Sequence, residues 1–166
     1  MDGARATILA AAVLLGVSPA ALAACPQELA VYADSGDAIS LEFMPNDGGR
    51  MMASNVFRAA MANDIVLDGV VIWNNGVTRP NGIMLHGCPE GDATGEEIAA
   101  CTVWEGVIYA VDGSGHVDYL PAEGEPAAEQ LLFPDLGRGV RYSAVWGEDK
   151  VTVVPQDVLK LSGCQE

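Results

Sequence analysis

Hydrophobic residues occur in most of this chain as short runs that are separated by turn-forming residues. Residues 28–33 and 38–43 are two such runs, and they flank a turn signal at 34–37. Residues 103–111 and 117–120 flank a second Gly- and Asp-containing turn in the same way. Short apolar-rich runs around such turns are typical of β-hairpins. The pattern therefore predicts a sheet that is built largely of hairpins.

Residues 51–62 show the spacing of an amphipathic helix. Met52, Val56 and Ala59 recur at intervals of three and four residues, so they would share one face of a helix. Asn63 follows as a residue that commonly ends helices. The spacing predicts the main helix of the protein over about 51–62.

A capping motif predicts a second, shorter helix. Thr94 precedes Glu97 by three residues, and the apolar residues 98–100 follow. In a capping box the threonine hydroxyl accepts a hydrogen bond from an amide of the first turn, and the glutamate reaches back to the threonine amide. We therefore expect a short capped helix over about 95–101.

These elements together predict the fold class. A largely antiparallel sheet of hairpins, with one main helix and one capped helix, is an α+β fold. The helix at 51–62 is followed by a strand-like run at 65–73, so a layered α/β sandwich is the alternative. Residues 140–146 alternate in hydrophobicity, which predicts another strand with Tyr142 and Trp146 on one face. No linker divides 25–166, so we expect one domain.

The start of the chain has the organisation of a secretory signal peptide. Asp2 and Arg5 precede an apolar run of 12 residues at 6–17, and Ser18, Pro19 and small residues follow. Such a run is shorter than the roughly 20 residues that a membrane-spanning helix needs. We expect residues 1–24 to be a cleaved signal peptide and the mature chain, without a transmembrane segment, to be periplasmic or secreted.

Residues 22–25 also match a bacterial lipobox, in which Cys25 would be lipidated. The chain contains four cysteines. Lipidation of Cys25 would leave an odd number of thiols in an oxidising compartment, whereas four free cysteines can form two disulfides. The cysteine count favours an ordinary signal peptide, with a membrane-anchored lipoprotein as the alternative.

Four cysteines allow three disulfide connectivities. We favour Cys88–Cys101 together with Cys25–Cys164, because the first closes a local loop and the second ties the ends of the mature chain. The same cysteines with His86 and His116 have the ligand types of a zinc or copper site. The chain has no Cys-x-x-Cys motif and no closely spaced pair of histidines, and thiols oxidise in such a compartment. We therefore expect no metal ion and no other cofactor.

The charge restricts the classes of partner. The net charge is −15, and it is unchanged when the first 24 residues are removed. Such a surface repels phosphate backbones, so we do not expect nucleic acid as a partner. Half of the residues are hydrophobic, which is enough for a buried core and argues against disorder. Arg138 and Arg141 stand out against this negative background; they can receive an anionic ligand or, more simply, pair with nearby acidic residues.

The densest carboxylate cluster lies beside a histidine. His86, Glu90 and Asp92 are the candidate catalytic residues of a hydrolase or metal-dependent enzyme, because crowded carboxylates can raise one another's pKa. The chain has no Gly-x-Ser-x-Gly motif and no phosphate-binding or dinucleotide-binding glycine loop. We therefore expect a non-enzymatic module that binds a protein partner or a small molecule. An enzyme that uses residues 86–97 and a lipid-anchored envelope protein are the alternatives.

Overall fold

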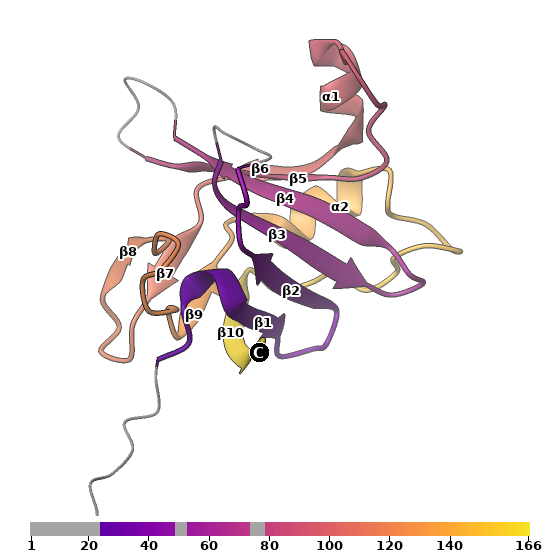
Figure 1. The fold of residues 1–166 in the computed structure, drawn as a ribbon. Helices are drawn as coiled ribbons and strands as arrows, with labels where there is room; N and C mark the ends of the chain where they lie inside the picture. Colours follow the sequence, from indigo (N-terminus) through magenta and orange to yellow (C-terminus); the bar gives the residue numbers. More distant parts are fainter. Residues whose placement is uncertain (1–23, 49–52, 74–78) are drawn as a thin grey trace, which may run out of the picture.

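The computed structural model describes residues 24–48, 53–73 and 79–166. In this part of the chain, ten strands form one sheet in the order β6-β5-β4-β3-β2-β1-β10-β9-β7-β8, and all neighbouring strands are antiparallel (Figure 1). The strands are β1 (Ala30–Asp34), β2 (Ile39–Met44), β3 (Ala53–Met61), β4 (Val66–Ile72), β5 (Asn81–Leu85), β6 (Thr102–Gly106), β7 (Tyr109–Val111), β8 (Val117–Tyr119), β9 (Gln130–Leu132) and β10 (Val158–Cys164). The predicted antiparallel sheet of hairpins is therefore present.

The described helices are few and short. They are the 3₁₀ turn η1 (Gln27–Leu29), α1 (Gly95–Cys101) and α2 (Leu136–Tyr142). α1 has the predicted capping box, in which the Thr94 side chain accepts from the Glu97 amide and the Glu97 carboxylate accepts from the Thr94 amide. Residues 1–23, which carry most of the predicted signal peptide, lie outside the described residues.

The predicted main helix at 51–62 is wrong. Residues 53–61 form β3, which pairs with β2 on one side and with β4 on the other. Phe57, Ala59 and Met61 are buried, whereas Arg58 and Ala60 are exposed, which is the two-residue alternation of a strand. The sequence suggested a helix because small residues such as Ala59 and Ala60 fit the spacing of a helix face as well as the alternation of a strand. Residues 51–52, the start of the expected helix, lie outside the described residues.

The fold class is therefore corrected in both of its forms. An α+β fold with a main helix is wrong, because the protein is mostly a curled antiparallel sheet with two small helices. The alternative, a layered α/β sandwich, is wrong because within residues 24–48, 53–73 and 79–166 no named strands pair in parallel and no helix layer covers the sheet. The expected strand at 140–146 is also wrong, because 136–142 form α2.

The curled sheet encloses a core that is rich in aromatic rings. Phe57 lies between Phe43 and Phe133, at centroid distances of 5.3 and 6.3 Å, and Trp104 lies 5.2 Å from Phe133. A Cβ at Gly69 would lie only 2.0 Å from the Phe57 ring, so this glycine in β4 lets the ring pack against the backbone. These contacts join strands that are distant in sequence.

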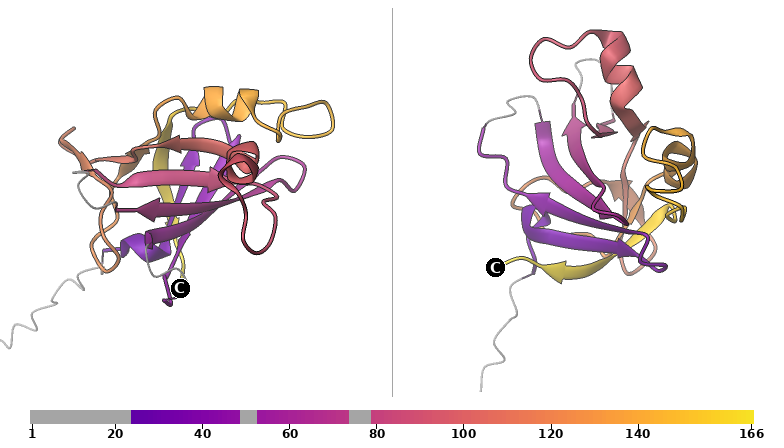
Figure 2. Two further views of the ribbon diagram at one scale, coloured as in Figure 1. Left: turned by 90° about the horizontal axis from the view of Figure 1, so that it is seen from above. Right: turned by 90° about the vertical axis from the view of Figure 1, so that its right-hand side faces the viewer.

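The curl of the sheet, which Figure 2 shows from two further sides, lets β3 and β4 contact the region of β8. Trp73, which follows β4, makes an edge-to-face contact with Tyr119 of β8 at 6.1 Å. The Asn55 side chain in β3 donates a hydrogen bond to the carbonyl oxygen of Pro121 at 3.1 Å. Side chains from β3 and from the end of β4 thus contact β8 and the residue Pro121 that follows it.

Candidate functional site

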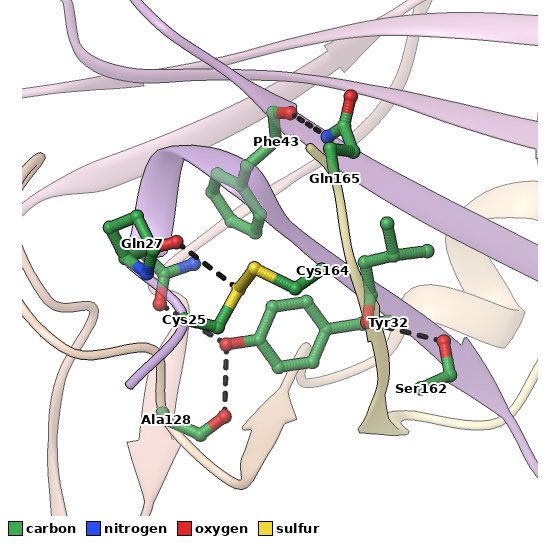
Figure 3. Close-up of a disulfide and its surroundings, with 10 residues drawn as sticks. Cys25, Gln27, Tyr32, Phe43, Ala128, Ser162, Cys164 and Gln165 are labelled. Atoms are coloured by element: carbon green, nitrogen blue, oxygen red, sulfur yellow. Dashed lines mark hydrogen bonds between the residues drawn. A yellow bond between two sulfur atoms is a disulfide. The ribbon is translucent and has the colours of Figure 1, made fainter. Parts of the chain in front are cut away.

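The two predicted disulfides are present. Cys88 is bonded to Cys101, 13 residues later, and Cys25 is bonded to Cys164, 139 residues later. The second bond ties the segment before η1 to the end of β10, next to the buried Tyr32 (Figure 3). Lipidation would require the sulfur of Cys25 that this bond occupies, so the lipid anchor and the Cys25–Cys164 bond exclude one another.

The candidate catalytic residues lie in the connection between β5 and α1. The Nδ1 atom of His86 lies 2.9 Å from the carbonyl oxygen of Val66. Glu90 and Asp92 are exposed, and within the described residues no hydrogen bond or ion pair joins either of them to His86. Glu97 is engaged by Thr94, whose backbone and side-chain hydrogen bonds lower the pKa of the Glu97 carboxyl. A catalytic role for these residues stays a prediction.

The residues of the metal site that was weighed as an alternative do not lie together. Cys88 and Cys101 share a disulfide and offer no thiolate. His86 follows β5, and His116 precedes β8 at a distant part of the molecule (Figures 1 and 2). Among residues 24–48, 53–73 and 79–166, no group of three or more His, Cys, Asp or Glu side chains is arranged to hold a metal ion.

One groove of about 620 Å³ lies between the β7–β8 hairpin and the segment 121–129, and we call it the acidic groove. Its charged lining residues are Asp112, His116, Asp118, Glu125 and Glu129. Three of the carboxylates are used by their own loops. Asp112 accepts from the Ser114 amide and hydroxyl and from the His116 amide at 2.7–2.9 Å. Asp118 accepts from the Tyr119 amide, and Glu125 from the Ala122 amide, both at 2.7 Å.

These hydrogen bonds have an electrostatic consequence at Asp112. The hydrogen bond from the Ser114 side chain, followed by that from the His116 backbone, lowers the pKa of the Asp112 carboxyl. An ionised carboxylate at this position holds the hairpin turn in shape. The polar chemistry of the acidic groove is therefore in large part internal to the loops that form it.

A second groove of about 630 Å³ lies between β6 and α2, and we call it the β6–α2 groove. All five residues of β6 line one wall. The other wall carries Asp135, Arg138, Gly139 and Tyr142. These positions are three, four and seven residues apart and so share one face of the helix. A strand edge and a helix face thus form the two walls.

Two glycines and one carboxylate fix α2 in this position. A Cβ at Gly139 would lie 2.7 Å from the Val103 carbonyl oxygen, and one at Gly137 would lie 2.7 Å from the Pro155 carbonyl oxygen. The Asp157 carboxylate accepts from the amides of Asp135 at 3.0 Å and Gly137 at 3.4 Å, which satisfies amides at the start of the helix. α2 therefore packs directly on the backbone at both sides.

Two side chains of the β6–α2 groove, Arg138 and Tyr142, are free to bind. The side chain of Tyr142 is 83% exposed, although it belongs to a helix that packs on the core. No hydrogen bond or ion pair involves the Arg138 side chain within the described residues. Arg141 differs, because its guanidinium lies 4.2 Å from the centre of the Trp146 ring. Trp104 lines the groove and is held by a hydrogen bond from its Nε1 to the Pro134 carbonyl oxygen at 2.8 Å.

Sequence reasoning found only part of this groove. It singled out Arg138 and Arg141 together, and the structure distinguishes them. It placed Tyr142 on a strand and did not recognise 102–106 as the edge of the sheet. The signal that was present is the pair Gly137 and Gly139, since two glycines in one short segment indicate close backbone packing.

Two findings do not depend on either groove. α1 and α2 have seven residues each, and no helix in the described part of the chain is long and apolar enough to cross a membrane. Comparison with protein-family models, with curated proteins and with solved structures gives no match.

Proposed function

We propose that this protein is an exported, disulfide-stabilised, non-enzymatic binding module that holds a protein partner in its β6–α2 groove. The observation that carries the proposal is the combination of an exposed Tyr142 and an unpartnered Arg138 side chain in one open groove. Tyrosine and arginine are among the residue types that contribute most to the binding energy of protein interfaces.

Export is supported by two independent features. The first 24 residues have the pattern of a signal peptide. The two disulfides, Cys25–Cys164 and Cys88–Cys101, are of a kind that persists in oxidising compartments and is rare in the cytosol of mesophilic organisms. A small molecule would also fit by volume, because ligand pockets measure roughly 300–1,000 Å³. The projecting Tyr142 favours a protein partner.

Export has its own test, the intact mass of the non-reduced protein after secretion by a bacterial host. We expect a chain that lacks the signal peptide and carries two disulfides. A mass that includes a lipid at Cys25, with Cys164 as a free thiol, would show the lipid-anchored alternative instead.

The binding role is tested with peptides as surrogate partners. A random linear-peptide library is selected on the purified protein with its disulfides intact, and the affinity of the best peptide is measured by fluorescence anisotropy. We expect Tyr142→Ala to weaken binding at least about tenfold, because a truncated interface anchor typically costs this much or more. The exposed position of Tyr142 means that the substitution should leave the thermal unfolding midpoint unchanged.

The matched control is Val153→Ala, since Val153 is 58% exposed and lies outside the lining of the groove. This variant should bind like the wild type. Equal weakening by both substitutions, or none by either, would contradict the assignment of the groove. Hydrolysis of a peptide or ester that is lost in His86→Ala would instead support the enzyme alternative.

A further inference from the structure

We propose that this protein forms a weak symmetric dimer through the outward face of strands β8, β7, β9 and β10. This inference goes beyond the proposed function, because it concerns a surface other than the β6–α2 groove and a different occupant, a second copy of the chain. It is carried by the register of the four strands, by the exposure of their outward side chains and by the placement of the charges.

The alternation of residues in these strands separates two faces of the sheet. Ala110 of β7, Leu131 of β9 and Leu159 of β10 lie opposite one another and are buried in the core. Successive residues of a strand point to opposite sides of the sheet, so the residues beside these three point outward. The apolar outward residues form what we call the outer apolar face, and they are Val117, Tyr119, Tyr109, Val111, Leu132 and Val158.

The outer apolar face is contiguous and accessible. Its longest row crosses all four strands through successive partners, which are Tyr119, Tyr109, Leu132 and Val158. The rings of Tyr109 and Tyr119 stack at a centroid distance of 6.4 Å. Val117 is 52% exposed and Val158 is 37% exposed, and the other four members are half-buried. An apolar surface of this kind, spread over neighbouring strands, is typical of an interaction site.

The charges of this part of the sheet lie on the other side. Three carboxylates from these strands and their connections line the acidic groove, and they are Asp112, Asp118 and Glu129. The outer apolar face has no carboxylate, although the chain has a net charge of −15. The outward partners beside it in β9 and β10 are Gln130 and Lys160. The negative charge is therefore kept away from this face.

The outward side of β2, β3 and β4 gives the contrast. Glu42, Arg58 and Asp68 are successive partners across these three strands, and all three are exposed. Arg58 and Asp68 form an ion pair at 3.5 Å. Charged side chains in such a row are typical of the solvated face of an antiparallel sheet. The outer apolar face lacks this pattern and is therefore not simply the solvated side of the same sheet.

A second copy is the occupant that this charge distribution favours. Two copies repel each other because each has a net charge of −15, and the repulsion is smallest where the facing surfaces carry no carboxylate. Arg79, which donates to the Tyr109 hydroxyl at 3.4 Å, and Lys160 lie beside the face and have no ion pair within the described residues. These two cations lower the repulsion further. An anionic membrane would instead repel the rest of the chain.

The shape of the face also suits a symmetric contact. In a two-fold dimer the same patch lies on both sides of the interface and must be complementary to itself. Apolar side chains on a sheet meet this requirement, because two sheets pack face to face about 10 Å apart. Six side chains are far fewer than the roughly 20–30 residues of a standard interface, so we expect a weak dimer with a Kd of roughly 10–100 μM.

The dimer is tested by sedimentation of the mature protein, with its disulfides intact, from about 1 μM to about 1 mM. We expect a reversible monomer–dimer equilibrium that Val117→Asp weakens at least about tenfold, because this change places a carboxylate in the face of both copies. The matched control is Val66→Asp, since Val66 is 43% exposed on the outward side of β4 and lies outside the face. A monomer at every concentration, or equal weakening by both substitutions, would overturn the inference.

A second variant covers the case in which Val117→Asp disturbs the folding of β8. Val158→Asp lies at the other end of the face, in a strand that is paired on both sides, and should weaken the dimer to a similar extent. The thermal unfolding midpoint of each variant shows which of them is folded. A folded Val158→Asp variant that dimerises like the wild type would show that the contact lies elsewhere.

The dependence on salt tests the charge argument. Raising the ionic strength from about 0.05 M to about 0.5 M screens the repulsion between two copies of the same charge. We therefore expect the dimer to become at least about threefold tighter. A dimer that salt leaves unchanged or weakens would contradict a contact that is apolar and opposed by net charge.

The proposed function and this inference can fail separately. The β6–α2 groove is not part of the outer apolar face, so Tyr142→Ala should leave the dimer unchanged and Val117→Asp should leave peptide affinity unchanged. A dimer that is abolished by Tyr142→Ala would place the contact in the groove and overturn this inference. A selected peptide that no longer binds to Val117→Asp would assign the face to a different protein and contradict the second copy.

Discussion

The two grooves of this protein are nearly equal in volume, about 620 and 630 Å³, but they differ in how much of their binding chemistry is already used. In the acidic groove, Asp112, Asp118 and Glu125 accept hydrogen bonds from their own loops. In the β6–α2 groove, Arg138 has no partner within the described residues and Tyr142 projects into solvent. The difference shows that side chains without partners, rather than groove volume, distinguish a candidate binding site.

The walls of the two grooves are also held differently. The segment 121–129 is tied to the region of Cys25 and β1, because the Ala127 amide donates to the Cys25 carbonyl oxygen at 2.8 Å and the Tyr32 hydroxyl donates to the Ala128 carbonyl oxygen at 2.9 Å (Figure 3). α2 is held instead by Asp157 and by its glycine contacts. Perturbing one set of anchors should therefore affect one groove more than the other.

The largest effect is expected from removal of the Cys25–Cys164 disulfide by substitution of both cysteines with Ala. Because this bond closes a loop of 139 residues, its loss should lower the free energy of unfolding by about 4–5 kcal/mol. Urea denaturation measures the loss, and amide hydrogen exchange should increase at 121–129 before it increases in α2. The matched change at Cys88 and Cys101 should cost about 3 kcal/mol. A larger loss in the free energy of unfolding for the Cys88–Cys101 pair would contradict the view that the Cys25–Cys164 bond is the stronger anchor.

Alkaline pH should weaken the same region. Burial raises the pKa of Tyr32 from 10.0 to about 12. Between these two values the unfolded chain has released the phenol proton while the folded protein keeps it, so the free energy of unfolding falls as pH rises, by up to about 3 kcal/mol, and is unaffected below pH 10. Urea denaturation from pH 9 to 12 measures this slope. It should be reduced in Tyr32→Phe but kept in Tyr142→Phe, and an equal slope in both variants would show that Tyr32 is not the source.

A smaller effect is expected at the wall of the β6–α2 groove. Asp157→Ala removes the acceptor for the amides of Asp135 and Gly137, so the free energy of unfolding should fall by about 1–2 kcal/mol and peptide binding should weaken with it. Calorimetry and anisotropy measure the two quantities. The exposed Asp149→Ala should change neither, and peptide binding that is unaffected by Asp157→Ala would separate α2 from the binding site.

The smallest effect is expected at Asp112. The pKa of Asp112 is lowered from its ordinary value of 3.8, so the hydrogen bonds of the ionised carboxylate stabilise the hairpin fully at pH values above 3.8. This stabilisation is lost as the pH falls through the lowered pKa. Asp112→Asn should therefore lower the melting temperature slightly at neutral pH, and the difference from the wild type should disappear in strong acid. Peptide affinity should not change. A large loss of affinity would move the binding site to the acidic groove.

Local signals in the sequence were sufficient for features that depend on local contacts. The capping box of Thr94 and Glu97 specified α1, and the Gly- and Asp-rich turns specified hairpins. The disulfide pairing followed from the positions of four cysteines. By contrast, β3 has alanines that fit either periodicity, and only its pairing with β2 and β4 decides that it is a strand.

The β6–α2 groove could not be found in this way, because it depends on contacts between distant segments. α2 begins 30 residues after the end of β6, and what brings them together is the packing of Gly139 on the backbone of Val103. The alternating pattern of 140–146 predicted a strand, but a helix forms because Leu136 and Val140 pack into the core. Arg138 was visible in the sequence, whereas its lack of a partner was visible only in three dimensions.

The central claim is that the partner binds between β6 and α2, and the most direct measurement is a titration of the isotope-labelled protein with the selected peptide, followed by amide chemical shifts. The account predicts that the largest changes occur at Thr102–Gly106 and at Arg138 through Tyr142, with little change at 112–129. Largest changes along the acidic groove, or around His86 and α1, would contradict it.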